Sequence, residues 1–206
     1  MPIRTVWTKL LDEILPPSDT VRLVRELPTD SLLTRTTPGI YQGVSYLLPY
    51  DDPWVRAAVH ANKYEHYTHA AKLLAHPLSH WLQDQPQPLY VVPMPLSYAR
   101  YRTRKHNQVE TILRHCTPRP VIRRRWLRRT RDTAPQTSLA RSDRMTNVEA
   151  AFRSCNIRLS GASDTPLTII LIDDVVTTGA TMTAARVALT PHLPPQATLQ
   201  CLALAH

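Results

Sequence analysis

The chain has 206 residues, 43% of them hydrophobic, so it is long enough to bury one substantial core. Its 25 Lys and Arg residues against 16 Asp and Glu residues give a formal net charge of +9, which favours a polyanionic partner. No apolar run reaches the roughly 20 residues that cross a bilayer, and Lys9, Asp12 and Glu13 stand where a signal peptide would be apolar, so we expect a cytoplasmic protein without a membrane span.

Hydrophobic spacing and the positions of the prolines predict helices and strands along most of the chain. The expected elements are, in order, a helix at 7–15, a strand at 43–48, a helical region at 53–81 with a break near Glu65, a strand at 89–92, a helix at 108–114, a short strand at 121–122, a helix at 139–150, a strand at 167–172, a helix at 180–189 and a last strand at 198–204. This alternation favours a doubly wound parallel sheet with right-handed crossovers. We therefore expect an α/β domain at 41–206, preceded by a short helical or irregular appendage at 1–40.

Residues 168–182 are the most informative segment of the chain. Five apolar or β-branched residues without alternation, at 168–172, predict a strand that is covered on both faces. Asp173 and Asp174 follow at its carboxyl end, where ligands bind in parallel sheets. Two adjacent carboxylates there can accept hydrogen bonds from a vicinal diol. The alternative is an ordinary turn after a core strand, but paired acids at such a position are costly unless they are solvated or used.

The turn after these acids has the composition of an anion site. Threonine hydroxyls can donate hydrogen bonds, a glycine lets the backbone approach closely, and the helix that follows presents free N–H groups. The residues concerned are Thr177, Thr178, Gly179, Ala180 and Thr181. The pattern predicts a ribose-phosphate site. It is not a nucleotide P-loop, because the chain contains no G-x-x-x-x-G-K-[ST] stretch.

Residues 169–182 resemble the phosphoribosyl-diphosphate motif of type I phosphoribosyltransferases, a hydrophobic strand followed by D-D-x-x-x-T-G-x-T. The resemblance implies that Asp173 and Asp174 bind the ribose hydroxyls as the catalytic pair and that residues 177–181 hold the 5′-phosphate. It also implies Mg²⁺ together with phosphoribosyl diphosphate as the ligand. The two carboxylates would stabilise the positive charge that develops on the sugar ring as diphosphate leaves.

Four further blocks, in the right order, resemble the ComF family of type I phosphoribosyltransferase fold. Residues 55–64, which end in Asn62-Lys63-Tyr64, resemble the family's "L-K-Y" segment. Residues 91–108, which include Arg100, Arg102, Arg104 and Lys105-His106-Asn107-Gln108, resemble "V-P-V-P-L … R … R-G-F-N-Q". Residues 128–136 resemble "R-x-T-x-x-Q", and Arg144, Asn147 and Phe152 resemble "R-x-x-N-x-x-x-A-F". The resemblance implies that Lys63 and Tyr64 face the cleft, although Tyr64 is equally compatible with the core. Implied contacts to diphosphate or its loop are Pro93, Met94, Arg102, Lys105, Asn107 and Arg131.

The sequence departs from the ComF pattern in two places. The family's N-terminal four-cysteine zinc module is missing, because Ser18 follows the double proline and the three cysteines, Cys116, Cys155 and Cys201, have no C-x-x-C spacing. We therefore expect no zinc. Lys105-His106 replaces Gly-Phe and Glu65-His66 replaces Arg-Gly. Loss of a glycine from a turn beside diphosphate would narrow or close the site, since other residues are strained at positive φ.

A basic run occupies residues 119–131 and contains seven arginines. Arginines around a tryptophan are a combination that holds single-stranded nucleic acid through phosphates and bases. The expected nucleic-acid contacts are Arg123, Arg124, Arg125, Trp126, Arg128 and Arg129. Two alternatives stay open: Trp126 anchors a core strand, and Arg128, Arg129 or Arg131 serves a basic loop over the diphosphate.

The resemblance to ComF implies a role in natural competence and DNA uptake. Our hypothesis is a protein that binds single-stranded DNA and a phosphoribosyl-type ligand, with competence helicase and recombination-mediator proteins as possible partners. The alternative is an active Mg²⁺-dependent phosphoribosyltransferase of nucleotide metabolism or salvage, whose acceptor the sequence does not identify.

Overall fold

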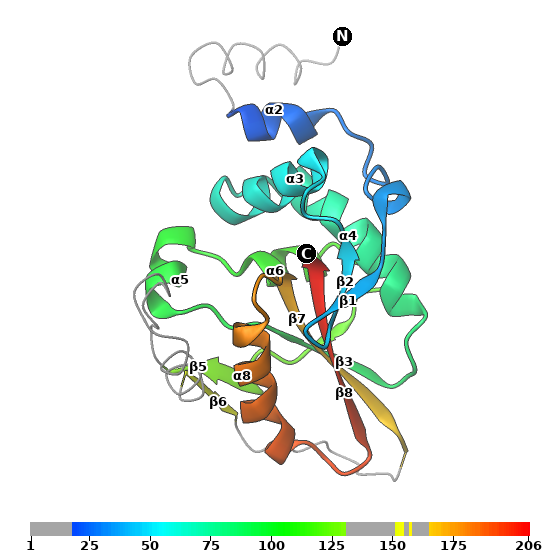
Figure 1. Cartoon of the computed structure of the whole chain (residues 1–206), viewed down its shortest axis with the longest axis vertical. Coiled ribbons are helices and arrows are strands. Elements are labelled where there is room, and N and C mark those ends of the chain that lie inside the picture. Colours follow the sequence, from blue (N-terminus) through cyan, green and yellow to red (C-terminus); the bar gives the residue numbers. More distant parts are fainter. Residues whose placement is uncertain (1–17, 131–150, 155–156, 158–164) are drawn as a thin grey trace.

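A six-stranded sheet with strand order β1-β2-β8-β7-β3-β4 organises the computed structural model, which describes residues 18–130, 151–154, 157 and 165–206 (Figure 1). The strands are β1 (Gly39–Tyr41), β2 (Val44–Leu48), β3 (Leu89–Pro93), β4 (Val121–Ile122), β7 (Leu167–Val175) and β8 (Ala197–Ala205). All neighbouring strands are parallel except β1, which pairs with β2 in an antiparallel hairpin. The predicted doubly wound α/β fold is confirmed.

Strand β7 lies inside the sheet and is buried on both faces, as its uninterrupted apolar sequence predicts. Ile170 and Ile172 belong to the core on one face of the sheet, whereas Ile169 and Leu171 belong to the core on the other. Side chains alternate along a strand, so Asp173 and Asp174 at the end of β7 extend this alternation toward opposite faces.

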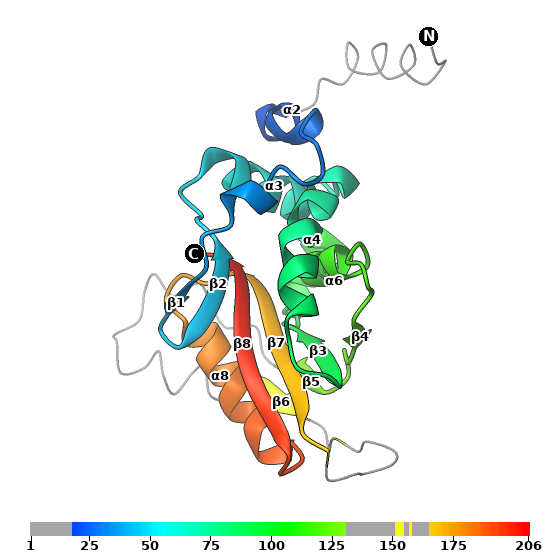
Figure 2. The ribbon, with the colours of Figure 1, turned by 90° about the vertical axis from the view of Figure 1, so that its right-hand side faces the viewer.

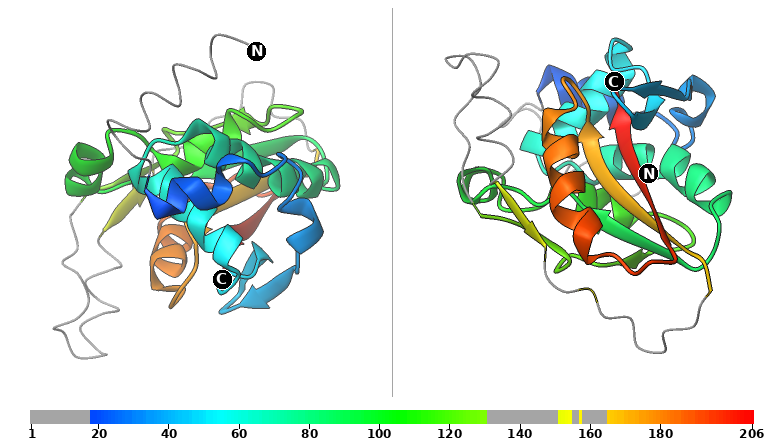
Figure 3. Two further views of the ribbon diagram at one scale, coloured as in Figure 1. Left: turned by 90° about the horizontal axis from the view of Figure 1, so that it is seen from above. Right: turned by 60° about the horizontal axis from the view of Figure 1, so that its bottom comes forward.

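Helices cover both faces of the sheet (Figure 2). One core contains side chains of α2 (Asp19–Arg25), α3 (Pro53–Tyr64), α4 (Thr68–Gln83) and α6 (Gln108–Leu113). The other face carries α8 (Ala180–Leu189) and a small two-stranded sheet of β5 (Leu127–Arg129) and β6 (Phe152–Ser154), which lies beside α8 (Figure 3). The remaining elements are α5 (Tyr98–Arg104) and the short 3-10 helices η1 (Leu33–Arg35) and η2 (Thr190–His192).

Local capping explains where the helices around the sheet ends begin. The Asp52 carboxylate accepts hydrogen bonds from the backbone N–H groups of Trp54 and Val55, and Pro53 occupies the first turn of α3. Asn107 caps α6 in the same way. Helix α3 ends at Tyr64 and α4 starts at Thr68, which confirms the predicted break near Glu65.

The other predictions divide into three groups. Strands expected at 43–48, 89–92, 121–122, 167–172 and 198–204 and helices expected at 108–114 and 180–189 are confirmed with small shifts at their ends. Elements α2, α5, β1, β5 and β6 were not predicted. The helices expected at 7–15 and 139–150 lie outside the described residues.

Residues 18–40 pack closely onto the α/β domain. Val21, Val24 and Leu32 lie in the same core as α3 and α4, and the predicted boundary after residue 40 falls within β1. In Figure 1, α2 and α3 lie beyond the end of the sheet to which β7 and β8 point. None of the helices in the described part of the chain is long and apolar enough to cross a membrane.

Candidate functional site

A cavity of about 320 Å³ opens at the carboxyl end of β7. Its walls come from α3, α5, α6, β5, the end of β7, the start of α8 and the loops after β2, β3 and β7. The lining residues include Tyr50, Lys63, Tyr64, Met94, Pro95, Leu96, Arg100, Arg104, Gln108, Arg129, Asp173, Asp174, Thr177, Thr178, Gly179, Thr181 and Met182. We call this cavity the β7 pocket. It brings the predicted ribose-phosphate residues together with basic side chains that are distant in the sequence.

Two carboxylates with different surroundings lie in the β7 pocket. Asp174 is 4% exposed, and its Oδ2 lies 3.1 Å from the Lys63 ammonium of α3. This contact is an ion pair without hydrogen-bond geometry, because Oδ2 accepts no hydrogen bond from the described residues. Asp173 Oδ1 accepts a hydrogen bond of 2.8 Å from the backbone N–H of Asp174.

The pKa of Asp173 is raised in the folded chain. Burial, and then the neighbouring charge of Asp174, raise this pKa from 3.8 to about 7. The hydrogen bond from the Asp174 N–H and the charges of Lys63 and Arg100 oppose part of this rise in pKa. The pair therefore offers both a carboxylate and a titratable carboxyl to a ligand with adjacent hydroxyls.

The loop after β7 has the backbone geometry of an anion site. Gly179 adopts a φ of 73° and caps α8, a ten-residue helix whose first N–H groups point out of its start. A Cβ atom at Gly179 would lie 3.0 Å from the Cβ of Gln42 in the β1–β2 turn, so the loop is closely packed as well as left-handed. Thr177 and Thr178 are exposed, and both line the β7 pocket with Thr181. Ala180 follows as the first residue of α8.

Four cations from three elements line the β7 pocket: Lys63 of α3, Arg100 and Arg104 of α5, and Arg129 of β5. Arg104 lies over the Tyr64 ring, 5.0 Å from its centroid, and donates a hydrogen bond of 3.3 Å to the Tyr64 hydroxyl. Arg129 lies over Phe152 at 5.3 Å. The side chains that surround the acids can therefore bind a polyanion such as diphosphate.

The predicted diphosphate contacts differ in their position relative to the β7 pocket. Pro93 is the last residue of β3, and Met94, 3% exposed, lines the β7 pocket directly after it. Asn107 does not line the pocket, but its side-chain amide donates a hydrogen bond of 2.9 Å to the Met94 carbonyl and so fixes the loop. Arg102 lies over Tyr98 and does not line the pocket. Arg131 lies outside the described residues.

Both positions where the ComF pattern has glycine adopt a left-handed backbone conformation in this chain. Lys105 has a φ of 55° and His66 a φ of 54°. Lys105 ends α5 and does not line the β7 pocket. The rings of His66 and His106 lie 4.2 Å apart, and His106 also contacts the carbonyl oxygens of Arg104 and Asn62. Lys105 and His66 therefore adopt the backbone conformation that glycine favours, at the cost of backbone strain.

The basic run is largely occupied by contacts within the protein. The Arg123 guanidinium lies 4.8 and 5.6 Å from the ring centroids of Tyr90 and Trp126, and these two rings contact each other with their centroids 5.5 Å apart. Arg124 Nε lies 2.6 Å from Glu110 Oε2, and Trp126 is partly buried against the core of the α8 face. Arg125 and Arg128 are exposed. The alternative that Trp126 anchors the core therefore fits its packing, and Arg129 is the one predicted nucleic-acid residue that lines the β7 pocket.

Sequence reasoning did not single out Arg100, Arg104, Tyr50 or Gln108 as site residues. Arg100 and Arg104 are four residues apart on α5, so they share a face of the helix, whereas Arg102 lies on another. If α5 had been predicted, its helical spacing would have distinguished Arg100 and Arg104 from Arg102. Among the described residues, no three His, Cys, Asp or Glu side chains are close enough to hold a metal ion.

The fold and the β7 pocket define a doubly wound α/β protein with paired acids at the end of a central strand and a glycine turn at the start of the next helix. No known protein family and no curated protein matches this chain. Its function therefore has to be argued from the pocket itself.

Proposed function

We propose that the β7 pocket binds a phosphoribosyl-type ligand and that the chain is a ComF-like protein of type I phosphoribosyltransferase fold. One arrangement carries the proposal: Asp173 and Asp174 lie near the carboxyl end of the central strand, and a glycine turn at the start of α8 follows within five residues. Paired acids suit the two ribose hydroxyls, and the helix start suits the 5′-phosphate.

The basic side chains suit the other end of the same ligand. Lys63, Arg100, Arg104 and Arg129 line the pocket that holds the acids, so a diphosphate on the ribose would meet several cations at once. Mg²⁺ bound to the diphosphate and the ribose hydroxyls would assist departure of the diphosphate. The acids would hold the sugar and favour positive charge on its ring.

Two roles are compatible with such a pocket. In the role we favour, the ligand is bound by a protein of natural competence and DNA uptake, with a competence helicase and recombination mediators as partners. In the alternative, the chain is an active phosphoribosyltransferase of nucleotide metabolism or salvage. Turnover of phosphoribosyl diphosphate with a nitrogenous acceptor would favour the alternative.

A second proposed activity is binding of single-stranded DNA across the mouth of the β7 pocket. Helix α5 buries none of its side chains, and Tyr98 is 72% and Tyr101 55% exposed. Arg100 and Arg104 of this helix line the same pocket as Arg129 of β5, so α5 and β5 flank its mouth. Exposed aromatic rings among arginines stack bases and hold phosphates. Arg125 and Arg128, exposed beside and within β5, supply further phosphate contacts.

Calorimetric titration with phosphoribosyl diphosphate and Mg²⁺ tests the ligand. We expect saturable binding by the native chain and loss of at least about a hundredfold in affinity when Asp173→Asn and Asp174→Asn are combined, because the ribose hydroxyls lose their acceptors. Asp84→Asn, at an exposed residue outside the pocket, serves as the control. Equal affinity in the folded double variant and the native chain would disprove the site.

Titration with a short oligothymidine at two salt concentrations tests the DNA surface. Changing Arg125 and Arg128 to Ala should reduce the slope of log K against log salt by about 1.4, since two fewer counterions are released. Changing Tyr98 and Tyr101 to Ala should weaken binding roughly tenfold or more and leave the slope unchanged, because stacking is lost and charge is not. Native affinity in both variants would exclude this surface.

A further inference from the structure

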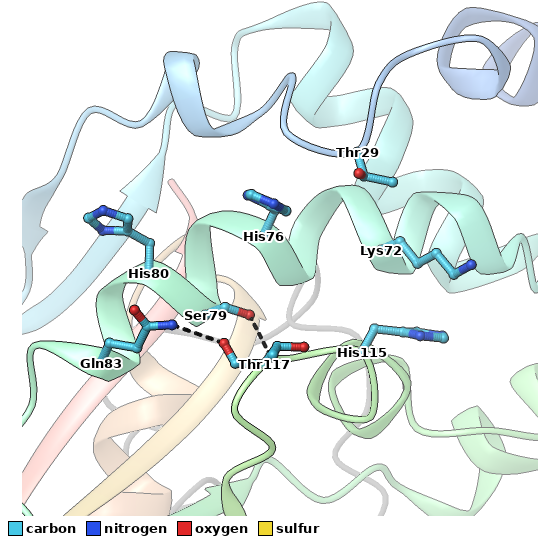
Figure 4. Close-up of a pocket in the computed structure, with 8 residues that line it drawn as sticks. All are labelled: Thr29, Lys72, His76, Ser79, His80, Gln83, His115 and Thr117. Carbon is cyan, nitrogen blue, oxygen red and sulfur yellow. Dashed lines mark hydrogen bonds between the residues drawn. The ribbon is translucent and has the colours of Figure 1, made fainter.

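A second cavity, of about 370 Å³, lies outside the β7 pocket and shares none of its lining residues. It is bounded by α4, the chain between α2 and η1, and the turn after α6 (Figure 4). Its lining residues are Thr29, Lys72, His76, Ser79, His80, Gln83, His115 and Thr117. We call it the α4 cavity.

One face of α4 supplies most of the α4 cavity. Lys72, His76, Ser79 and Gln83 recur at helical spacing, and the opposite side of the helix carries the buried leucines of the core. The cavity wall is fixed by hydrogen bonds that Figure 4 shows. Gln83 Nε2 donates to the Thr117 carbonyl at 3.0 Å, and the Thr117 N–H donates to Ser79 Oγ at 3.1 Å. Helix and turn are therefore held together where the cavity opens.

The described residues that line the α4 cavity include one permanent cation and no acid. Lys72 lines it with the imidazoles of His76, His80 and His115, which can donate hydrogen bonds, and no Asp or Glu is among the lining residues. The pKa of His115 is lowered by burial and then by the charges of Lys72, Arg119 and Arg114, all of them cations.

The nearest acids in the sequence are elsewhere or already paired. Asp30 follows Thr29 and Asp84 follows Gln83, but neither lines the cavity. Glu110 of α6 lies 2.6 Å from Arg124 and 3.7 Å from Arg114. The cavity therefore presents positive charge with hydroxyl donors from Thr29 and Thr117, and no carboxylate to repel an anion.

We propose that the α4 cavity is a second anion site, which binds a phosphate group through Lys72, His76 and His115. Cationic donors with neighbouring hydroxyls suit a phosphate better than a carboxylate, because a phosphate has more acceptor oxygens to satisfy. The phosphate can be inorganic or belong to a small phosphate ester, since the chemistry recognised is the same. The site would act independently of the β7 pocket.

Binding at this site should depend on pH. The groups that line the cavity are Lys72, His76 and His80 on α4 and His115 on the turn, and the charges of Arg119 and Arg114 also act on His115. Burial and these cations lower the pKa of His115 in the free chain, whereas a bound phosphate dianion favours its protonated form, so phosphate should raise the pKa of His115.

The experiment is a titration of the full chain with sodium phosphate, followed through the ring signals of the histidines by NMR at constant ionic strength. Signals of His76, His80 and His115 should shift and saturate. No histidine lines the β7 pocket, so phosphate bound only there would leave these signals unchanged and failure of one site is distinguishable from failure of the other. Ribose 5-phosphate and inorganic phosphate, compared at the same signals, distinguish an ester from the free anion.

Matched variants decide whether the shifts come from this cavity. Lys72→Gln and His76→Gln remove exposed side chains and should each weaken phosphate binding at least fivefold. Arg186→Gln and His192→Gln likewise remove an exposed cation and an exposed imidazole, at residues that line neither cavity, and should not. Unshifted histidine signals at millimolar phosphate, or equal weakening in all four variants, would overturn the proposal.

Discussion

The acids and glycine turn of the β7 pocket and the basic run at 119–131 were both predicted from the sequence to bind ligands, but the charges of the pocket and of the run have different surroundings in the folded chain. In the pocket, acids at the end of β7 meet Lys63, Arg100, Arg104 and Arg129 around one cavity. In the run, Arg123 lies over an aromatic ring, Arg124 pairs with an acid on α6, and Arg129 lines the β7 pocket. A local density of charge therefore says little about which charges remain available to a ligand.

The Lys63–Asp174 ion pair gives the largest expected effect on stability. Lys63→Met keeps the aliphatic length but leaves the buried Asp174 carboxylate without its cation, so the free energy of unfolding should fall by roughly 2–4 kcal/mol at pH 8. Urea denaturation measures it. The double variant Lys63→Met with Asp174→Asn should recover most of the loss. A single variant as stable as the native chain would mean that the pair is solvated and that the pocket does not hold its acids as described.

The titration of Asp173 gives the next effect. Its pKa of about 7 in the folded chain exceeds the ordinary 3.8, so the folded state holds this proton more strongly than the unfolded state. The stabilisation is complete below pH 4 and is lost as the pH rises toward 7. Asp173→Asn should therefore match the native stability near pH 4 and exceed it by about 1–3 kcal/mol above pH 7. Denaturation curves across this range, compared between the two proteins, measure the difference; a constant difference would refute the shifted titration.

Within the basic run, variants of Arg123 and Arg125 compare an arginine that contacts the protein with one that is exposed. Arg123→Ala removes a guanidinium that lies over two neighbouring aromatic rings and should lower the free energy of unfolding by about 1–2 kcal/mol. Arg125→Ala changes an exposed residue and should cost less than about 0.5 kcal/mol. Thermal unfolding of both variants measures the contrast. Equal losses would show that position in the fold does not distinguish these arginines.

The parts of the fold that the sequence predicted are those with a local signal. The strand at 167–172 could be predicted because burial on both faces leaves an unbroken apolar run, and the two acids and the glycine fall within the next seven residues. The helix at 180–189 begins at that glycine. These features need no knowledge of distant residues.

What the sequence did not predict depends on distant partners or lacks a hydrophobic pattern. Helix α5 buries nothing, so it has no apolar period to read, and its two pocket arginines were not distinguished from Arg102. Strands β5 and β6 are three residues each and exist through their pairing with each other. The partner of Asp174 comes from α3, more than a hundred residues earlier in the chain.

Lys105 is a basic residue outside both regions, next to Arg104 of the β7 pocket, and it has a left-handed backbone conformation. Its φ of 55° strains any residue that has a Cβ, and glycine relieves this strain while losing more entropy on folding. Lys105→Gly should therefore raise the free energy of unfolding by about 0.5–1 kcal/mol, a shift of about 2 °C in the unfolding temperature. Lys105→Ala, which keeps the Cβ, should give no gain. Because Lys105 does not line the pocket, both variants should bind phosphoribosyl diphosphate as the native chain does. If both bound it more weakly to the same degree, the lysine charge would belong to the diphosphate site, and the basic residues of this turn would have to be assigned to the pocket after all.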